Sequence, residues 1–142
     1  MNANPACAAS AAPALDTLDV RAHATAQSLD TFDAYRVSLD ACRACAPIAA
    51  QLSANLRDQL LRASSSVVLN TAEGFGSSSR GIKRRHYEIA RRSAIECVAI
   101  LDVASVIGVG VGAGVGVGDV EQARTLFTRA AMMLAKLVAR FR

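Results

Sequence analysis

Six basic side chains crowd residues 79–92 and form the strongest chemical signal in the chain. Only one acid, Glu88, opposes them, so this stretch carries a net charge of +5, while the whole chain of 142 residues carries +4. Guanidinium groups form planar, bidentate contacts with phosphate. The pattern therefore predicts a face that binds RNA or DNA through the phosphate backbone, with little discrimination between bases. The predicted binding residues are Arg80, Lys83, Arg84, Arg85, Arg91 and Arg92.

A helical step of about 100° per residue spreads these side chains over one broad face. Arg80, Arg84 and Arg91 fall in one stripe, and Arg85 and Arg92 fall in the adjacent one. A charged face that only contacts water is the alternative interpretation. The other side of the same helix is expected to face the core with Ile82, His86, Ile89, Ala90 and Ser93.

Glu73 and Glu96 are the two carboxylates that could act as a pair, either to hold a metal or for acid–base chemistry. A di-metal centre in a helical bundle adds Glu-x-x-His motifs, and the sequence contains none. The alternative, which we favour, is that Asn70 and Glu73 tie the end of a helix to backbone or to a neighbouring arginine. The three serines at 64–66 have no evident histidine–acid partners. We therefore expect no catalytic residues and no enzyme activity.

The segment Cys42-Arg43-Ala44-Cys45 has the CxxC spacing that metal and redox sites use. Such sites also need a second cysteine pair, nearby histidines or a βαβ context, and the sequence offers none of these. We expect these cysteines to pack as small apolar residues, with no metal and no cofactor bound.

Glycine occupies every second position from Gly108 to Gly118. Dinucleotide-binding and phosphate-binding loops require odd spacings between their glycines, which strict alternation excludes. A flexible or hairpin-like linker is the expected structure.

Apolar spacing at i, i+3 and i+4 predicts four helices, at about 32–49, 55–73, 80–107 and 119–141. Pro47 is expected to kink or end the first helix near Ala46. The first helix is expected to bury Phe32, Tyr35, Leu39, Cys42, Ala46 and Ala49. The last helix is expected to bury Val120, Phe127, Ala131, Leu134, Val138 and Phe141. Short connections favour an all-α, antiparallel up-down-up-down four-helix bundle over residues 30–142, after a disordered Ala-rich tail at residues 1–29.

Residues 94–107 are apolar around nearly the whole helical circumference. A lone bundle buries only one stripe of each helix, so the rest of this segment indicates a subunit contact through Ile95, Val98 and Val103. The stretch from Ile95 to Val117 is long enough to span a bilayer, but it contains Glu96 and Asp102, which are costly there. A soluble, cytoplasmic protein with no membrane partner is expected.

The segment Asn70-Thr71-Ala72-Glu73-Gly74, with Glu96 downstream, resembles one family closely. These are the small four-helix bundle proteins encoded in intervening sequences of bacterial large-subunit ribosomal RNA genes. The accessory variability determinant of diversity-generating retroelements looks like a relative. Gly74 after an apolar run is expected to stop the helix as a left-handed cap.

The resemblance implies a four-helix bundle that forms ring-like homo-oligomers, typically pentamers. Most family members have no established activity, and the retroelement relative is understood to assist a reverse transcriptase through a basic surface. The sequence thus favours a non-catalytic, oligomeric protein that binds nucleic acid or serves a ribonucleoprotein, with a reverse transcriptase or another protein as a further partner. A structural or protein-interaction scaffold is the rival hypothesis.

Overall fold

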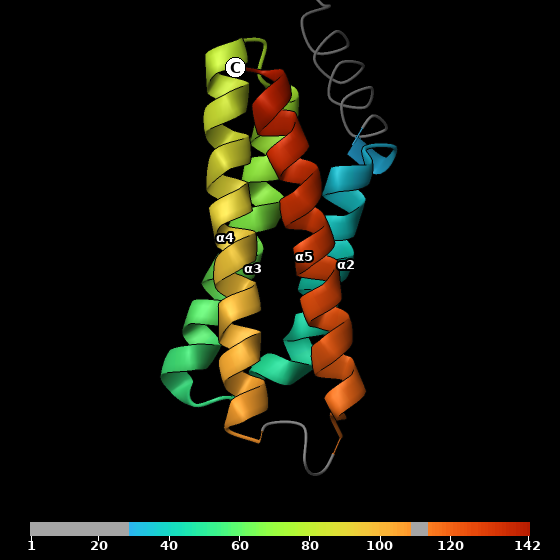
Figure 1. Cartoon of the computed structure of the whole chain (residues 1–142), viewed down its shortest axis with the longest axis vertical. Coiled ribbons are helices and arrows are strands. Elements are labelled where there is room, and N and C mark those ends of the chain that lie inside the picture. The colour runs from blue at the N-terminus through green and yellow to red at the C-terminus, as the bar shows by residue number, and fades with distance from the viewer. Residues whose placement is uncertain (1–28, 109–113) are drawn as a thin grey trace, which may run out of the picture.

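The computed structural model describes residues 29–108 and 114–142, and these contain four long helices and no strand. The predicted tail at residues 1–29 lies almost wholly outside this described part, as does the centre of the Gly-Val repeat. The all-α, four-helix architecture is confirmed (Figure 1). The helices are α2 (Asp33–Ala49), α3 (Ala54–Gly76), α4 (Arg80–Val106) and α5 (Val117–Arg140).

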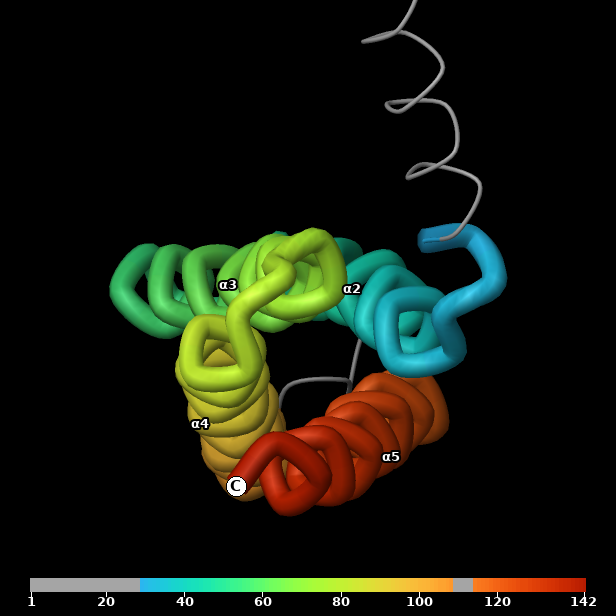
Figure 2. Tube along the Cα trace, turned by 90° about the horizontal axis from the view of Figure 1, so that it is seen from above, coloured from blue at the N-terminus to red at the C-terminus, as the bar shows by residue number. Residues whose placement is uncertain are grey.

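The helices stand at the four corners of a square when the bundle is viewed along its axis (Figure 2). Each one packs against its two neighbours, in the order α2, α3, α4, α5 and back to α2. Figure 1 shows the chain passing down α2, up α3, down α4 and up α5. Consequently the start of α4, the end of α3 and the end of α5 meet at the same end of the bundle.

The core is filled mainly by small and aliphatic side chains, with Phe127 as the largest fully buried one. On α5 the predicted stripe is largely correct, because Val120, Phe127, Leu134 and Val138 are buried. On α2, Ala49 is buried and Phe32 packs against the core as predicted, but the other four predicted positions are wrong by about one residue. The side chains that face the core are Ala34, Val37, Ser38, Ala41, Cys45, Ile48 and Ala49.

Side-chain size explains the error on α2. Tyr35 and Leu39 are half-buried and lie at the edges of the core-facing side of α2. Ala34, Ser38 and Ala41 point inward and let α2 approach the core closely. Ser38 remains satisfied there because its hydroxyl donates to the carbonyl of Ala34 at 2.7 Å. The helix also continues through Pro47 and ends two residues later, close to the end expected from a residue that has no N–H to donate and whose ring crowds the preceding turn.

Gly74 does not stop its helix, which corrects the sequence-based expectation. It lies inside α3, which continues to Gly76, and it is not among the glycines with positive φ. A Cβ atom at this position would lie 2.6 Å from Cε1 and 2.8 Å from Cδ1 of Tyr87. The glycine is therefore required for the contact between α3 and the Tyr87 ring of α4. The left-handed glycine occurs instead at Gly108, with φ of 81°, just after α4.

Tyr87 belongs to a row of aromatic rings at the end of the bundle where α4 begins. Ring centroids are 4.9 Å apart for Phe75 and Phe32, 6.4 Å for Phe32 and Tyr87, and 5.9 Å for Tyr87 and Phe141. The four rings come from α3, the start of α2, α4 and the end of α5. They join all four helices at this end, where Arg80 and Lys83 of α4 lie near the ring of Phe141.

Candidate nucleic-acid interface

The arginines of α4 lie outside the core, where the start of the helix is held by a serine cap. The hydroxyl of Ser79 accepts a hydrogen bond from the backbone N–H of Ile82, which fixes the first turn. Arg84, Arg85 and Arg92 are exposed, and Arg91 is half-buried. Within the described residues none of these four guanidinium groups has an ion pair or a hydrogen bond, so all four remain available to an anion.

Arg80 and Lys83 differ from these four because both are used inside the chain. The Lys83 ammonium donates to the carbonyl of Gly74 at 3.1 Å and of Phe75 at 2.8 Å. These carbonyls belong to the last turn of α3, which has no helical partners for them. Arg80 Nη2 donates to the carbonyl of Arg140 at 3.3 Å. Lys83 therefore has a structural role, and Arg80 a partly structural one.

Three cations surround one ring at this end of the bundle. The charged groups of Arg80, Lys83 and Arg140 lie 5.8, 5.9 and 5.9 Å from the centroid of Phe141. Such cation–π contacts contribute about 0.5–1 kcal/mol each at exposed sites. These contacts hold Arg80 and Arg140 at the junction of α4 and α5. The basic surface is therefore continuous across the two helices.

The second half of α5 adds cations that the sequence analysis missed. Arg129, Lys136 and Arg140 are exposed, and no acid occurs after Glu121. Because α5 runs antiparallel to α4, this half lies beside the first half of α4 (Figure 1). The absence of any acid over residues 122–142 was a readable signal, but only the fold shows that these cations join those of α4.

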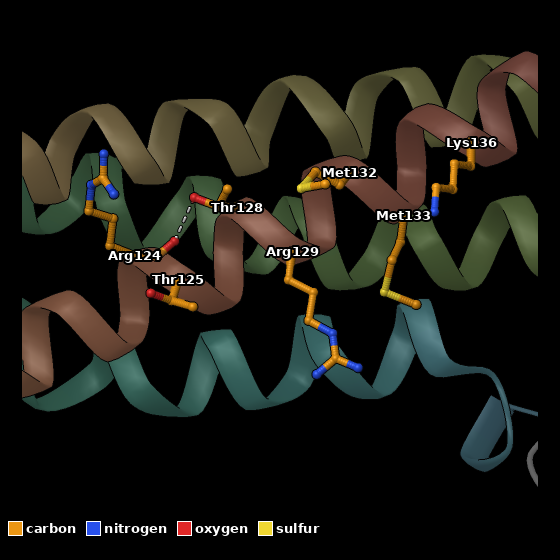
Figure 3. A pocket seen from close by; sticks show the side chains of 7 residues that line it. All are labelled: Arg124, Thr125, Thr128, Arg129, Met132, Met133 and Lys136. Carbon is orange, nitrogen blue, oxygen red and sulfur yellow. Dashed lines mark hydrogen bonds between the residues drawn. The ribbon is translucent and has the colours of Figure 1, made fainter.

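A shallow cleft runs along the outer side of α5 (Figure 3). Its volume is about 450 Å³, and all of its lining residues come from this one helix. They are Arg124, Thr125, Thr128, Arg129, Met132, Met133 and Lys136. Arg124 is already neutralised, because its Nε lies 2.6 Å from Oδ1 of Asp102 on α4. This hydrogen bond, together with the charge of Asp102, raises the pKa of Arg124.

Asn70 and Glu73 converge on the imidazole of His86. Nδ1 of His86 lies 3.0 Å from Oδ1 of Asn70 and 3.0 Å from Oε2 of Glu73. Both partners are acceptors, so the proton must reside on Nδ1. The amide of Asn70 donates back to the carbonyl and hydroxyl of Ser66, whose Oγ lies 2.8 Å from Oγ of Ser93. The expected bond to backbone is present, from Asn70 to the carbonyl of Ser66, but the charged partner is a histidine of α4 and not an arginine.

The network also explains which face of α4 is buried. Ile82 and Ile89 were expected in the core, but they are 51% and 37% exposed. The polar side chains of His86 and Ser93 occupy the contact between α3 and α4. Ile82 and Ile89 therefore lie at the outer edge of this contact. The core face of α4 consists of Tyr87, Ala90, Ser93, Ala94, Cys97, Ile100, Leu101 and Ala104.

No paired-carboxylate site is assembled. Glu73 contacts His86, which precedes Glu96 by ten residues on α4, or about 15 Å along the helix axis. Glu96 is exposed, and Ala72 beside Glu73 is half-buried. The part of the chain that the structure describes contains no group of three histidine, cysteine or acidic residues able to hold a metal.

The cysteines of the CxxC segment lie against the core. Cys45 and Cys97 are fully buried and Cys42 is half-buried, all three as free thiols. Burial raises the pKa of Cys45 to about 11 and also raises the pKa of Cys97. Protonated, buried thiols are poor nucleophiles and poor ligands, so the geometry supports a packing role.

The predicted interface residues divide into two kinds. Ile95 is 48% exposed and Val103 is 45% exposed, whereas Val98 is half-buried and packs against the core of its own chain. Further apolar exposure continues through Val106 and Ile107, at 87% and 58%. The outward face of α4 therefore changes from cationic in its first half to apolar in its second half.

The sequence model of the family described as 23S rRNA-intervening sequence protein matches residues 23–111. The chain belongs to this family. The matched span contains α2, α3 and α4, hence the motif around Asn70 and the arginine face, while α5 follows it. No curated protein matches the chain. Among the described residues of this family member, no helix is long and apolar enough to cross a membrane.

Proposed function

We propose that the protein is a non-catalytic, oligomeric nucleic-acid-binding protein, or an accessory subunit of a ribonucleoprotein, that uses the arginine face of α4. The observation that carries this proposal is the set of four unpaired guanidinium groups at Arg84, Arg85, Arg91 and Arg92. Of the nine other arginines in the described chain, four are matched with acids, namely Arg36, Arg43, Arg57 and Arg124. Cations left unmatched on one surface are what a polyanionic partner requires.

The chemistry of the face favours phosphate over other anions. Guanidinium groups spaced along one helix can each contact a different phosphate of a nucleic-acid backbone. The one aromatic side chain within residues 79–92, Tyr87, is 2% exposed and cannot stack on a base. Binding by this face is therefore driven by counterion release and varies little with base sequence.

Two double variants test the location of binding, because each removes two positive charges from exposed helical positions. Arg84→Gln with Arg92→Gln removes unpaired cations from α4. Arg36→Gln with Arg43→Gln removes arginines on α2 that pair with Asp33 and Asp40. Glutamine keeps helix propensity in both. In fluorescence anisotropy at about 50 mM salt, where such contacts are strongest, the first variant should lose affinity for an RNA or DNA oligonucleotide and the second should retain it. Equal losses would mean that only the net charge matters.

The exposed apolar half of α4 supports the oligomeric part of the proposal. Four large aliphatic side chains, Ile95, Val103, Val106 and Ile107, are exposed in this half of α4 and just after it, and a cluster of exposed apolar side chains often marks a protein–protein contact. A second copy of the chain is the proposed partner for this half, and a pentameric ring follows from the family resemblance. A symmetric ring repeats the arginine face on every subunit, which multiplies weak phosphate contacts.

The same apolar surface favours the second candidate function, a protein-interaction scaffold. In that case the arginines contact only water and bind no nucleic acid, and a protein such as a reverse transcriptase is the partner. Failure of the wild-type protein to retain either RNA or DNA at about 50 mM salt would decide for the scaffold.

A further inference from the structure

The cleft on α5 contains an exposed thioether between two unpaired cations. Met132 is 62% exposed. Arg129 precedes it and Lys136 follows it, and neither has an ion pair within the described chain. All three side chains line the same cleft of about 450 Å³ (Figure 3).

The two cations, Arg129 and Lys136, lie at different heights along α5. Lys136 follows Arg129 by seven positions, which corresponds to about 10.5 Å along the axis of α5. Met132 lies between them. Arg124 forms the far wall, but its charge is matched by Asp102. The hydroxyl of Thr128 already donates to the carbonyl of Arg124 at 2.9 Å. The cleft therefore presents an apolar centre with one available positive charge at either end.

We infer that this cleft receives an unpaired base of a single-stranded nucleic acid, with the phosphates on either side of that base held by Arg129 and Lys136. This inference rests on the proposed function and specifies its ligand. A base has an apolar, polarizable face, and sulfur contacts such faces favourably. In a single strand the base is free to turn outward, whereas a duplex keeps its bases stacked inside and presents phosphates and groove edges. A duplex would leave Met132 without a partner.

Charge complementarity favours this occupant over a second copy of the chain. The cleft has no acidic lining residue, and the fold places it beside the cationic half of α4. A second copy would need unpaired acids to match it, but Asp33, Asp40 and Asp58 are already engaged by arginines. Few acids without an ion pair remain in the described chain, among them Glu88 and Glu96 on α4. A nucleic-acid strand provides negative charge on both sides of each base.

The test compares a single-stranded oligonucleotide with a hairpin duplex of equal length and composition, by fluorescence anisotropy at one low salt concentration. The wild-type protein should prefer the single strand. Met132→Ala should weaken single-strand binding about two- to ten-fold, the range expected for one lost sulfur–aromatic contact, and should leave duplex binding unchanged. Leu69→Ala is the matched control, because Leu69 on α3 is 61% exposed and lies outside the cleft. It should change neither affinity.

The possible failures are distinguishable. Equal wild-type binding of single strand and duplex, or an unchanged preference in Met132→Ala, overturns this inference and leaves the arginine face of α4 intact as the binding surface. A change in oligomer size in Met132→Ala, measured by light scattering, assigns the cleft to a subunit contact and also overturns it. Failure of the wild type to bind either probe overturns the proposed function together with this inference.

Discussion

Replacement of Gly74 by alanine should destabilise the protein, although alanine is the better helix former. The new methyl group would lie 2.6 to 3.1 Å from three ring carbons of Tyr87. The ring has little room to retreat, because it is 2% exposed and lies between the rings of Phe32 and Phe141. Overpacking of this kind costs about 1–3 kcal/mol, and a gain of about 1 kcal/mol from helix propensity opposes it. With a contact this short, we expect a net loss of about 2 kcal/mol.

Gly76→Ala provides the control within the same helix. A Cβ atom there would meet no atom within 4 Å, and this glycine is exposed. The variant should therefore be unchanged or more stable by up to about 1 kcal/mol. Urea unfolding of both variants at one protein concentration measures the difference in unfolding free energy. If Gly74→Ala proves as stable as Gly76→Ala, the steric explanation for the glycine of the motif is refuted.

Three other outcomes are expected. Lys83→Met should lower the free energy of unfolding by about 1–3 kcal/mol in urea unfolding, because it leaves two carbonyls at the end of α3 without a donor. A loss below about 0.5 kcal/mol, which is typical of a surface change, would contradict the capping role. With the fourth cysteine of the sequence, Cys7, replaced by serine to remove its signal, Cys42 should react with a thiol reagent at pH 8 well before Cys45 and Cys97. Burial raises the pKa of Cys45 and Cys97 and keeps both thiols protonated at this pH. Fast reaction of all three thiols would contradict the burial of Cys45 and Cys97. Ile95→Glu with Val103→Glu should dissociate the oligomer, measured by light scattering at micromolar concentration, because each change places a charge at the proposed contact. The subunit itself should stay folded, since both residues are about half exposed within it. An unchanged particle size would place the subunit contact elsewhere.

The sequence predicted the fold well where large apolar residues recur at helical spacing. Val120, Phe127 and Leu134 define the buried face of α5 by size alone. The same reasoning failed on α2, because Ala34 and Ser38 face the core while Tyr35 is at the border. Small residues carry no periodic signal that distinguishes an inward from an outward position.

The candidate site could be predicted only in part, because several of its features depend on contacts between helices. The unpaired arginines of α4 are visible in the sequence as a charge run. The internal bonds of Lys83 are not, since they require the end of α3 to lie beside the start of α4. The pairing of Glu73 with His86 and the cleft around Met132 likewise appear only when the helices are assembled.

The most direct test of the central claim is the salt dependence of nucleic-acid binding. The logarithm of the binding constant for a single-stranded oligonucleotide is measured against the logarithm of salt concentration, for the wild type and for the variant with Arg84, Arg85, Arg91 and Arg92 replaced by Gln. If each arginine neutralises one phosphate, the negative slope should become shallower by about 3, with thermal stability and oligomer size unchanged. Parallel lines for the two proteins would contradict the account, because they would show that these arginines contact no phosphate.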